Sequence, residues 1–236
     1  MANIIKLGSL YLDGHPVEIG TEYVPGQTIR IGDTITGKEI SWVAVNGILI
    51  ADQCLLTYIS WKDLDAQGFV FGKEIAAQGF KFKIRLLKVS SNEGVPNEWD
   101  TALDTAGDDD YLWHCRGKYF WGQESARWDA SHRMTRGYGS ACGFVWRSSG
   151  RRYATLGFRP ALELFPTDHA ALRHGQEALV VGRAGAVVGG LIDATAYDLV
   201  IQPNADWLIG EADFAANMQD GTLAVDRSRI ISIATA

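Results

Sequence analysis

The sequence predicts an α+β fold in which short strands and long ordered loops dominate and the helices are short. The chain has 236 residues, with eight Trp, eight Tyr, nine Phe and 26 Gly but only three Met. This composition is more typical of sheets and ordered loops than of helical bundles. Apolar runs bounded by turn residues predict strands, and two short helix signals interrupt them. The length fits one large domain, or one domain with a small appendage.

The first fifty residues carry strand and turn signals. Short apolar runs between Ile4 and Ile31 are broken by Asp-Gly and Pro-Gly pairs, which predict a hairpin or meander. Residues 39–45 and 48–51 are apolar runs on either side of Asn46-Gly47. Asn-Gly in this context is the strongest short-range signal for a β-hairpin, so we expect one here.

Two short helices and two strands follow. Ser60 and Asp63 have the spacing of a capping box and predict a helix over residues 61–66. Strands are expected at residues 69–71 and 80–89, the second with one buried and one basic face. Residues 96–104 place two apolar side chains four apart, which predicts the second helix.

Residues 105–155 show no regular period but contain four Trp, so we expect a long ordered loop of functional importance. Residues 156–164 predict a closing strand in which Pro160 lies at an edge or a bulge. Beyond this strand the chain has one Trp and is rich in Ala, Val, Gly and Asp. This shift predicts three parts: a β lead-in over 1–35, a central domain over 36–166 and a small mainly β tail or assembly domain over 167–236.

The tail is expected to be a small sheet with one helix. A short helix is predicted near 207–217. Its predicted strands are 178–181, 186–191, 197–201, 222–225 and 230–233.

Charge and cysteine content exclude several classes. The formal net charge of −6 argues against nucleic-acid binding through a broad basic face. Cys54, Cys115 and Cys142 are distant in sequence and odd in number, which favours reduced thiols. No apolar stretch approaches membrane-spanning length, and Met1–Lys6 does not resemble the start of a signal peptide. We therefore expect synthesis in the cytoplasm without a signal peptide, and no membrane insertion.

Two motifs carry a resemblance. Arg136-Gly-Tyr-Gly-Ser-Ala-Cys142 and Leu156-Gly-Phe-Arg-Pro-Ala-Leu162 look like the ending of sulfatase-modifying-factor-type domains. That superfamily includes formylglycine-generating enzymes and the variable ligand-binding proteins of diversity-generating retroelements, and it implies a C-type-lectin-like core. Together with Lys38–Trp42 and Tyr119–Gly122, the closing strand also resembles uncharacterised lectin-fold modules of gut bacteria and their phages. The resemblance covers residues 36–165.

In the resembling family, the segment before the closing strand displays the ligand-contacting residues. By position, the ligand-binding candidates here are Tyr138, Ser140, Trp146, Ser148, Arg151, Arg152 and Tyr153, with Phe144 and Ser149 nearby. Such aromatic, small polar and Arg side chains are typical of recognition surfaces. We expect Phe144 and Trp146 to pack inward and Tyr138, Arg151, Arg152 and Tyr153 to be exposed. Arg136, Arg159 and Trp121 are expected to serve structure, and the two arginines need carboxylate or carbonyl partners.

No cofactor or metal site is predicted with a defined pattern. Asp108–Asp110 could supply oxygen ligands to Ca²⁺, but a solvated acidic turn explains the run better. His114, His132, His169 and His174 form no metal-binding pattern. An oxidase of the formylglycine-generating type needs a close cysteine pair in the final loop region, where Cys142 stands alone. No catalytic residue is therefore assigned.

These observations predict a non-enzymatic binding or display module. A phage or prophage particle component of the decoration, fibre or receptor-binding type fits best. It would recognise a protein or glycan surface as part of a homo-oligomer or larger assembly in the virion. The alternatives are a phage-encoded intracellular inhibitor of a host protein and an oxidase of the formylglycine-generating type.

Overall fold

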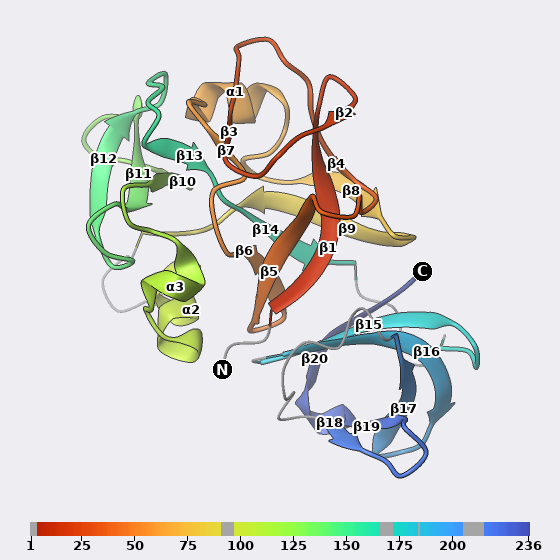
Figure 1. Ribbon diagram of the computed structural model, residues 1–236. Helices are drawn as coiled ribbons and strands as arrows, with labels where there is room; N and C mark the ends of the chain where they lie inside the picture. The colour runs from red at the N-terminus through yellow and green to blue at the C-terminus, as the bar shows by residue number, and fades with distance from the viewer. Residues whose placement is uncertain (1–3, 91–96, 166–171, 184, 205–214) are drawn as a thin grey trace.

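The computed structural model describes residues 4–90, 97–165, 172–183, 185–204 and 215–236. These residues form twenty strands in three sheets and three α-helices, the longest of nine residues. The α+β class predicted from the sequence is therefore wrong, because the protein is mostly β (Figure 1).

An eight-stranded sheet forms the centre of the molecule, in the order β2-β1-β5-β6-β14-β9-β8, with β4 also paired to β1. Strand β1 lies in the predicted lead-in and pairs directly with β5, which lies in the predicted central domain. The strands are β1 (Ile4–Leu12), β2 (His15–Pro16), β4 (Ile29–Gly32), β5 (Glu39–Val45), β6 (Ile48–Ala51), β8 (Lys73–Ala77), β9 (Phe80–Leu86) and β14 (Pro160–Leu164).

The hairpin predicted around Asn46-Gly47 is confirmed. Strands β5 and β6 pair antiparallel up to Val45 and Ile48. Asn46 and Gly47 have φ values of 47° and 81°, and two successive left-handed residues make the tight turn that matches the twist of paired strands. The local sequence was sufficient here because the turn chemistry and the apolar pattern agree.

A six-stranded sheet has the order β12-β11-β10-β13-β7-β3. Its strands are β3 (Thr21–Glu22), β7 (Leu56–Thr57), β10 (Tyr119–Ser125), β11 (His132–Gly137), β12 (Phe144–Ser148) and β13 (Leu156–Phe158). Residues 105–155 were expected to be a long loop, and this is wrong since three of these strands lie there. The alternation of apolar and polar residues that marks a strand is hidden here, because β10 carries a register shift and β11 is buried on both faces towards its end.

The closing segment crosses from one sheet to the other. Leu156–Phe158 pairs in the six-stranded sheet and Pro160–Leu164 in the eight-stranded sheet, with the fully buried Arg159 between them. Pro160 was expected at an edge or bulge, but it begins a strand flanked on both sides by β6 and β9. A first strand position tolerates proline, since the missing N–H falls where the chain enters the ladder.

The helices are short and capped as their sequences indicate. Helix α1 (Trp61–Ala66) has the predicted capping box between Ser60 and Asp63. Helix α2 (Glu98–Ala106) begins at the Asn97 cap, and α3 (Asp110–Trp113) is a single turn. Residues 69–71, expected to be a strand, form a turn whose carbonyls at Phe69 and Val70 accept from the Leu86 amide.

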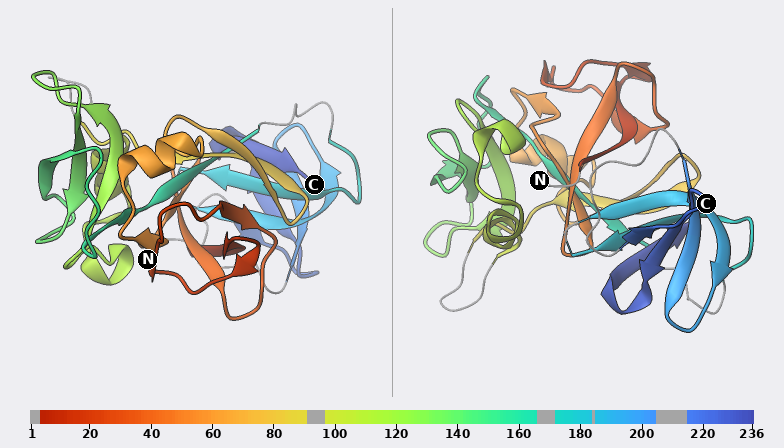
Figure 2. Two further views of the ribbon diagram at one scale, coloured as in Figure 1. Left: turned by 90° about the horizontal axis from the view of Figure 1, so that it is seen from above. Right: turned by 60° about the horizontal axis from the view of Figure 1, so that its bottom comes forward.

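The C-terminal sheet has the order β18-β19-β17-β16-β15-β20 and curls around an apolar interior (Figure 2). All five predicted tail strands are present. Of the helix predicted near 207–217, residues up to 214 lie outside the described part of the chain, and the last three residues form strand β18 instead. The elements are β15 (Glu177–Gly182), β16 (Ala186–Ala194), β17 (Asp198–Pro203), β18 (Ala215–Asn217), β19 (Leu223–Asp226), the 3₁₀ turn Arg227–Arg229 and β20 (Ile230–Thr235).

The C-terminal sheet is joined to the rest of the protein through a common core. Leu179 and Val181 of β15 belong to the large apolar cluster that contains Trp42, whereas the alternate residue Val180 faces the interior of the C-terminal sheet. The β5–β6 turn adds backbone bonds from the Asn46 amide to the Arg183 carbonyl and from Gly47 to Gly182. Strand β15 is therefore buried on both faces, which explains its continuous apolar sequence.

Among the described residues, no helix combines the length and apolar character needed to cross a membrane.

Candidate functional site

A group of four tyrosines and one arginine lies on or next to the strands of the six-stranded sheet, with Tyr119 on β10 and Arg147 on the edge strand β12. We call Tyr58, Tyr119, Tyr138, Arg147 and Tyr153 the tyrosine–arginine surface. The rings of Tyr119 and Tyr138 are stacked, with centroids 4.8 Å apart and an interplanar angle of 9°. The Arg147 guanidinium lies 5.2 Å from the Tyr119 ring centroid and 5.8 Å from that of Tyr153. The result is a continuous contact of aromatic, aromatic, cation and aromatic groups.

Strand alternation places Arg147 on this surface. Arg147 pairs with Arg133 of β11, and the two side chains share one face of the sheet. Arg133 packs over the Trp61 ring of α1 at 4.0 Å, on the same side as Tyr119. The residues before and after Arg147 point to the opposite face, so one strand supplies the two sides of the sheet with different chemistry.

The backbone holds Tyr138 in a fixed position. Its φ is 79°, and its amide donates to the Lys118 carbonyl at 2.8 Å while its carbonyl accepts from Gly117 at 2.8 Å. The preceding Gly137 has a φ of 102°, and a Cβ there would collide with the Lys118 carbonyl oxygen. Glycine is therefore required at this position to bring Tyr138 against Tyr119.

The segment carrying Tyr153 has no regular secondary structure but is tied down at several points. The Tyr153 carbonyl accepts from the amides of Tyr58 at 3.1 Å and Leu156 at 3.0 Å. Next to it, the Lys118 ammonium donates to the Ala154 carbonyl at 2.7 Å. These bonds fix the segment against β10 and β7. The backbones of the exposed Tyr58 and Tyr153 are therefore held rigidly.

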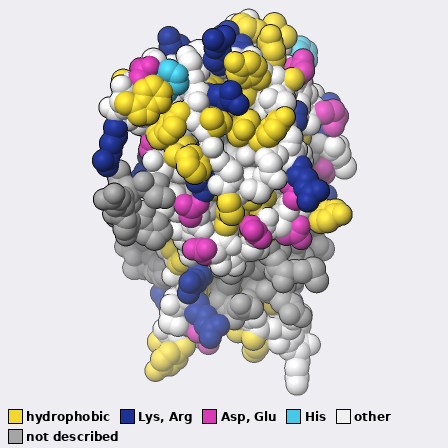
Figure 3. Space-filling view, turned by 90° about the vertical axis from the view of Figure 1, so that its left-hand side faces the viewer, with side chains coloured by type: hydrophobic (Ala, Val, Ile, Leu, Met, Phe, Trp, Pro, Cys, Tyr) yellow, Lys and Arg dark blue, Asp and Glu magenta, His cyan; other side chains and the backbone are white. Residues whose placement is uncertain are grey.

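The surface carries local positive charge in a chain of net charge −6. Arg152 is neutralised by Asp63, with Nε and Nη2 donating to the two carboxylate oxygens at 2.8 and 2.7 Å. Burial alone would raise the pKa of Asp63, but hydrogen bonds from Arg152 and Ser60 hold it below its ordinary value. Arg147 and the exposed Arg151 have no ion pair among the described residues. Figure 3 views the molecule from the side of β12, and hydrophobic and basic side chains gather on the upper part of the side in view.

The predicted binding residues divide between two faces. Tyr138, Ser140, Arg151 and Tyr153 are exposed, and Arg152 is half-buried in its ion pair. Trp146 and Ser148 lie on the other face of β12, where Trp146 packs half-buried against the core cluster that includes Met134. Ser149 is buried. The structure thus brings Tyr138 and Tyr153 together through Tyr119 and Arg147, leaves Arg151 exposed two residues from Tyr153, and places Trp146 and Ser148 on the other face.

Phe144 was expected to pack inward, and this is wrong because 61% of its surface is exposed. It lies at the start of the edge strand, opposite Arg136. Sequence reasoning also missed Tyr58, Tyr119 and Arg147. The alternation across residues 144–148 could have separated Arg147 from Trp146, but those residues were not recognised as a strand.

The residues expected to be structural are buried. Trp121 is inaccessible, and its indole N–H donates to the Ile59 carbonyl at 2.9 Å. Arg136 pairs with the Asp100 carboxylate. Arg159 is fully buried, donates to the Trp113 carbonyl and lies 4.8 Å from the Phe120 ring centroid. These contacts join the two sheets to α2 and α3.

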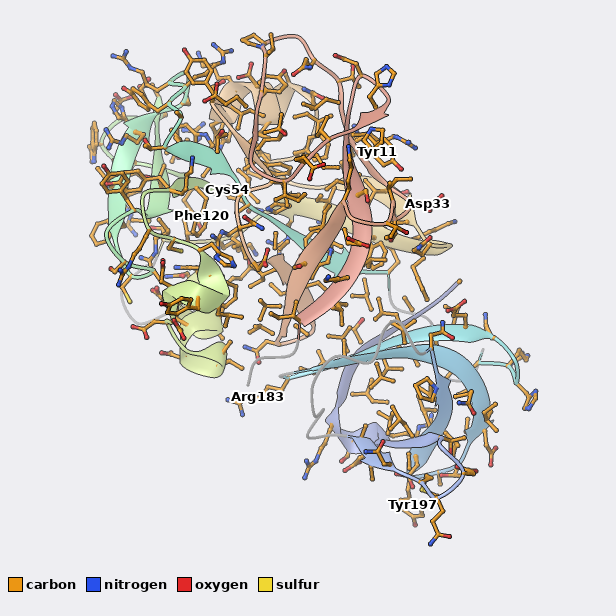
Figure 4. The ribbon with its side chains drawn as sticks, viewed as in Figure 1. Tyr11, Asp33, Cys54, Phe120, Arg183 and Tyr197 are labelled. Carbon is orange, nitrogen blue, oxygen red and sulfur yellow. The ribbon has the colours of Figure 1, made fainter. Side chains whose placement is uncertain are left out.

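The cysteines occupy different environments. Cys54 and Cys115 are buried, and Cys142 is exposed. Burial raises the pKa of the Cys54 and Cys115 thiols, although the nearby Arg159 charge opposes this effect. Both buried thiols are therefore protonated at neutral pH. Figure 4 labels Cys54 beside Phe120, within the body of the protein.

The acidic run supports local structure. Asp108 is exposed, Asp109 accepts from the Tyr111 amide, and Asp110 accepts from Cys115 at 2.9 Å and Arg116 at 2.7 Å. Within the part of the chain that the structure describes, no group of three or more His, Cys, Asp or Glu side chains is placed to hold a metal ion.

Comparison of the chain with protein-family models, with curated proteins and with solved structures finds no match. The resemblance to sulfatase-modifying-factor-type domains thus stays a prediction from the sequence motifs. Function must be inferred from the site itself.

Proposed function

We propose that this chain is a non-enzymatic binding module whose tyrosine–arginine surface recognises a protein or glycan. The observation that carries the proposal is the rigid presentation of exposed tyrosines around an arginine that has no ion pair. Tyrosine provides a large contact area with little loss of conformational entropy on binding, and arginine provides directional hydrogen bonds. Backbone bonds at Tyr138 and Tyr153 order the surface before a ligand arrives, which lowers the entropic cost of binding.

We further propose that the module is a component of a phage or prophage particle, present there in several copies. The resemblance of Lys38–Trp42, Tyr119–Gly122 and Leu156–Leu162 to modules of gut bacteria and their phages supports this part. In this arrangement the C-terminal sheet is available for assembly. The tyrosine–arginine surface belongs to the six-stranded sheet, which is a different sheet.

The test uses particles induced from a culture that encodes the chain. Immunogold labelling should place the chain on the particle, and the purified full-length chain should compete with particle adsorption to host cells. The double variant Tyr138→Ser/Arg147→Ser should compete at least about tenfold less well, because it removes two contacts from the surface. The variant Arg30→Gln, on β4 of another sheet, should compete like the wild type. Absence of the chain from particles, or equal competition by both variants, would contradict the proposal.

A further inference from the structure

The four tyrosines of the tyrosine–arginine surface share a chemical feature. None of their phenolic hydroxyls has a hydrogen-bond partner among the described residues. By contrast, the buried Tyr11 donates to the Asp33 carbonyl at 3.0 Å, and Tyr23 donates to the Gln27 carbonyl at 3.2 Å. The surface therefore presents several unpaired hydroxyls, each able to donate and to accept, on rings of which Tyr119, Tyr138 and Tyr153 are linked by stacking or through Arg147.

Arg147 adds an anion-binding group within this set of hydroxyls. Its guanidinium is held over Tyr119 and Tyr153, and no carboxylate of the described chain neutralises it. A planar guanidinium packed over rings keeps its N–H edge available for bidentate bonds to a carboxylate or sulfate. Arg151, also exposed and without an ion pair, lies four residues further along the chain.

We propose that the tyrosine–arginine surface binds an anionic saccharide, a sugar chain bearing carboxylate or sulfate groups. This inference rests on the proposed binding function and specifies its ligand. A saccharide carries hydroxyls around each ring, which match the clustered phenols, and its acidic group matches Arg147. The apolar face of a sugar ring can also lie against the exposed parts of Tyr138 and Tyr153, which are 46% and 39% accessible.

Two other polyanions fit the surface less well. Single-stranded nucleic acid binds by stacking bases on free aromatic faces. Here Tyr119 and Tyr138 each cover one face of the other, and Arg147 covers part of Tyr119 and Tyr153, so only part of each ring is left for a base. An acidic peptide supplies carboxylates but few hydroxyls for the phenols. Hydroxyl-rich ligands therefore match the exposed groups best.

The experiment measures binding of the full-length chain by isothermal titration calorimetry. The anionic probes are oligogalacturonate, which carries carboxylates, and dextran sulfate, which carries sulfates. Neutral dextran, poly-glutamate and a single-stranded oligothymidylate complete the set. We expect binding to at least one anionic saccharide, little binding to dextran, and weaker binding at higher ionic strength. The stronger of the two anionic probes identifies the acidic group.

Matched variants locate the binding. Arg147→Gln should weaken the affinity at least about tenfold, because it removes a charge-assisted bidentate contact. Arg30→Gln removes an exposed arginine that lies 4.4 Å over the Tyr11 ring on another sheet, and it should leave affinity unchanged. Tyr138→Phe keeps the ring and removes one hydroxyl, so we expect a loss of about threefold to tenfold. Tyr197→Phe, in the turn between β16 and β17, is its control.

Each outcome decides a separate question. Binding to poly-glutamate or oligothymidylate at least as tight as to both saccharides would overturn the saccharide inference but leave the proposed binding function standing. Failure of both anionic saccharides to bind would also overturn the saccharide inference. The proposed binding function would then still stand if the chain is found on particles and competes for adsorption. If Arg147→Gln and Arg30→Gln behave alike, the assigned surface is wrong.

Discussion

Replacement of Gly137 by alanine tests how the structure holds Tyr138. Gly137 has a φ of 102°, a conformation that side chains with a Cβ rarely adopt. The added Cβ would also collide with the Lys118 carbonyl oxygen, which accepts the hydrogen bond from the Tyr138 amide. The substitution therefore strains the backbone and displaces the acceptor that positions Tyr138.

The two effects can be given a magnitude. Backbone strain of this kind costs about 1–3 kcal/mol. Overpacking against a rigid neighbour costs about another 1–3 kcal/mol. We expect Gly137→Ala to lower the free energy of unfolding by about 2–6 kcal/mol, which corresponds to a fall in melting temperature of about 4–24 °C for a chain of this length.

Urea denaturation followed by tryptophan fluorescence would measure this change, with Gly139→Ala as the control. Gly139 is two residues away, and a Cβ there would meet no heavy atom within 4 Å. The near-ultraviolet circular dichroism of the stacked tyrosines should change in Gly137→Ala only. Equal stability of the two variants would refute the reasoning, because it would show that the Gly137 backbone does not constrain Tyr138.

Three further predictions concern stability. Glu98→Gln should cost about 2–4 kcal/mol in urea denaturation, since the buried Arg85 would lose a charged partner that it contacts twice at 2.7 Å; no loss would contradict this. Leu179→Asp should lower the stability of the whole chain in one transition, seen equally by fluorescence and circular dichroism, because Leu179 lies in the common core; two separate transitions would contradict it. The lowered pKa of Asp63 stabilises the fold above the pKa of the unfolded chain, and this contribution is lost as the pH falls through the folded-state value. The stability gap between wild type and Asp63→Asn should therefore narrow in acid titrations below about pH 4, and a constant gap would contradict the assignment.

Local signals predicted those elements whose turn or cap chemistry is contained in a few residues. The Asn46-Gly47 hairpin and the Ser60–Asp63 capping box appear as expected because backbone geometry and side-chain bonding are decided within each motif. The strands of the C-terminal sheet were also found. Their apolar runs are bounded by turns, so the limits of each strand are marked in the sequence.

The prediction of the fold class is wrong because of one stretch of sequence. Strands β10 and β11 lack a simple alternation of apolar and polar residues, since their sheet is covered on one side by α2 and α3 and partly on the other by α1. Their pairing is set by long-range contacts such as that of β10 with β13. Such tertiary context overrides local propensity, and a single sequence does not show it.

The candidate site was predicted in part for the same reason. Tyr138, Arg151 and Tyr153 were found from composition and position, and they are exposed. Tyr119 and Arg147 complete the surface only through the pairing of β10, β11 and β12. Without these strands, the sequence could not separate the face of Trp146 from the face of Arg147.

Hydroxyl-radical footprinting of tyrosine side chains tests the central claim most directly. The full-length chain would be oxidised with and without a saturating concentration of whichever anionic saccharide, oligogalacturonate or dextran sulfate, binds more tightly, and the modification of each tyrosine would be measured by mass spectrometry. We predict protection of Tyr58, Tyr138 and Tyr153, and unchanged modification of the exposed Tyr111 and of Tyr197, which projects from the far end of the C-terminal sheet (Figure 4). Protection confined to Tyr111 or Tyr197, or no protection of the first three, would contradict the assignment of this surface as the binding site.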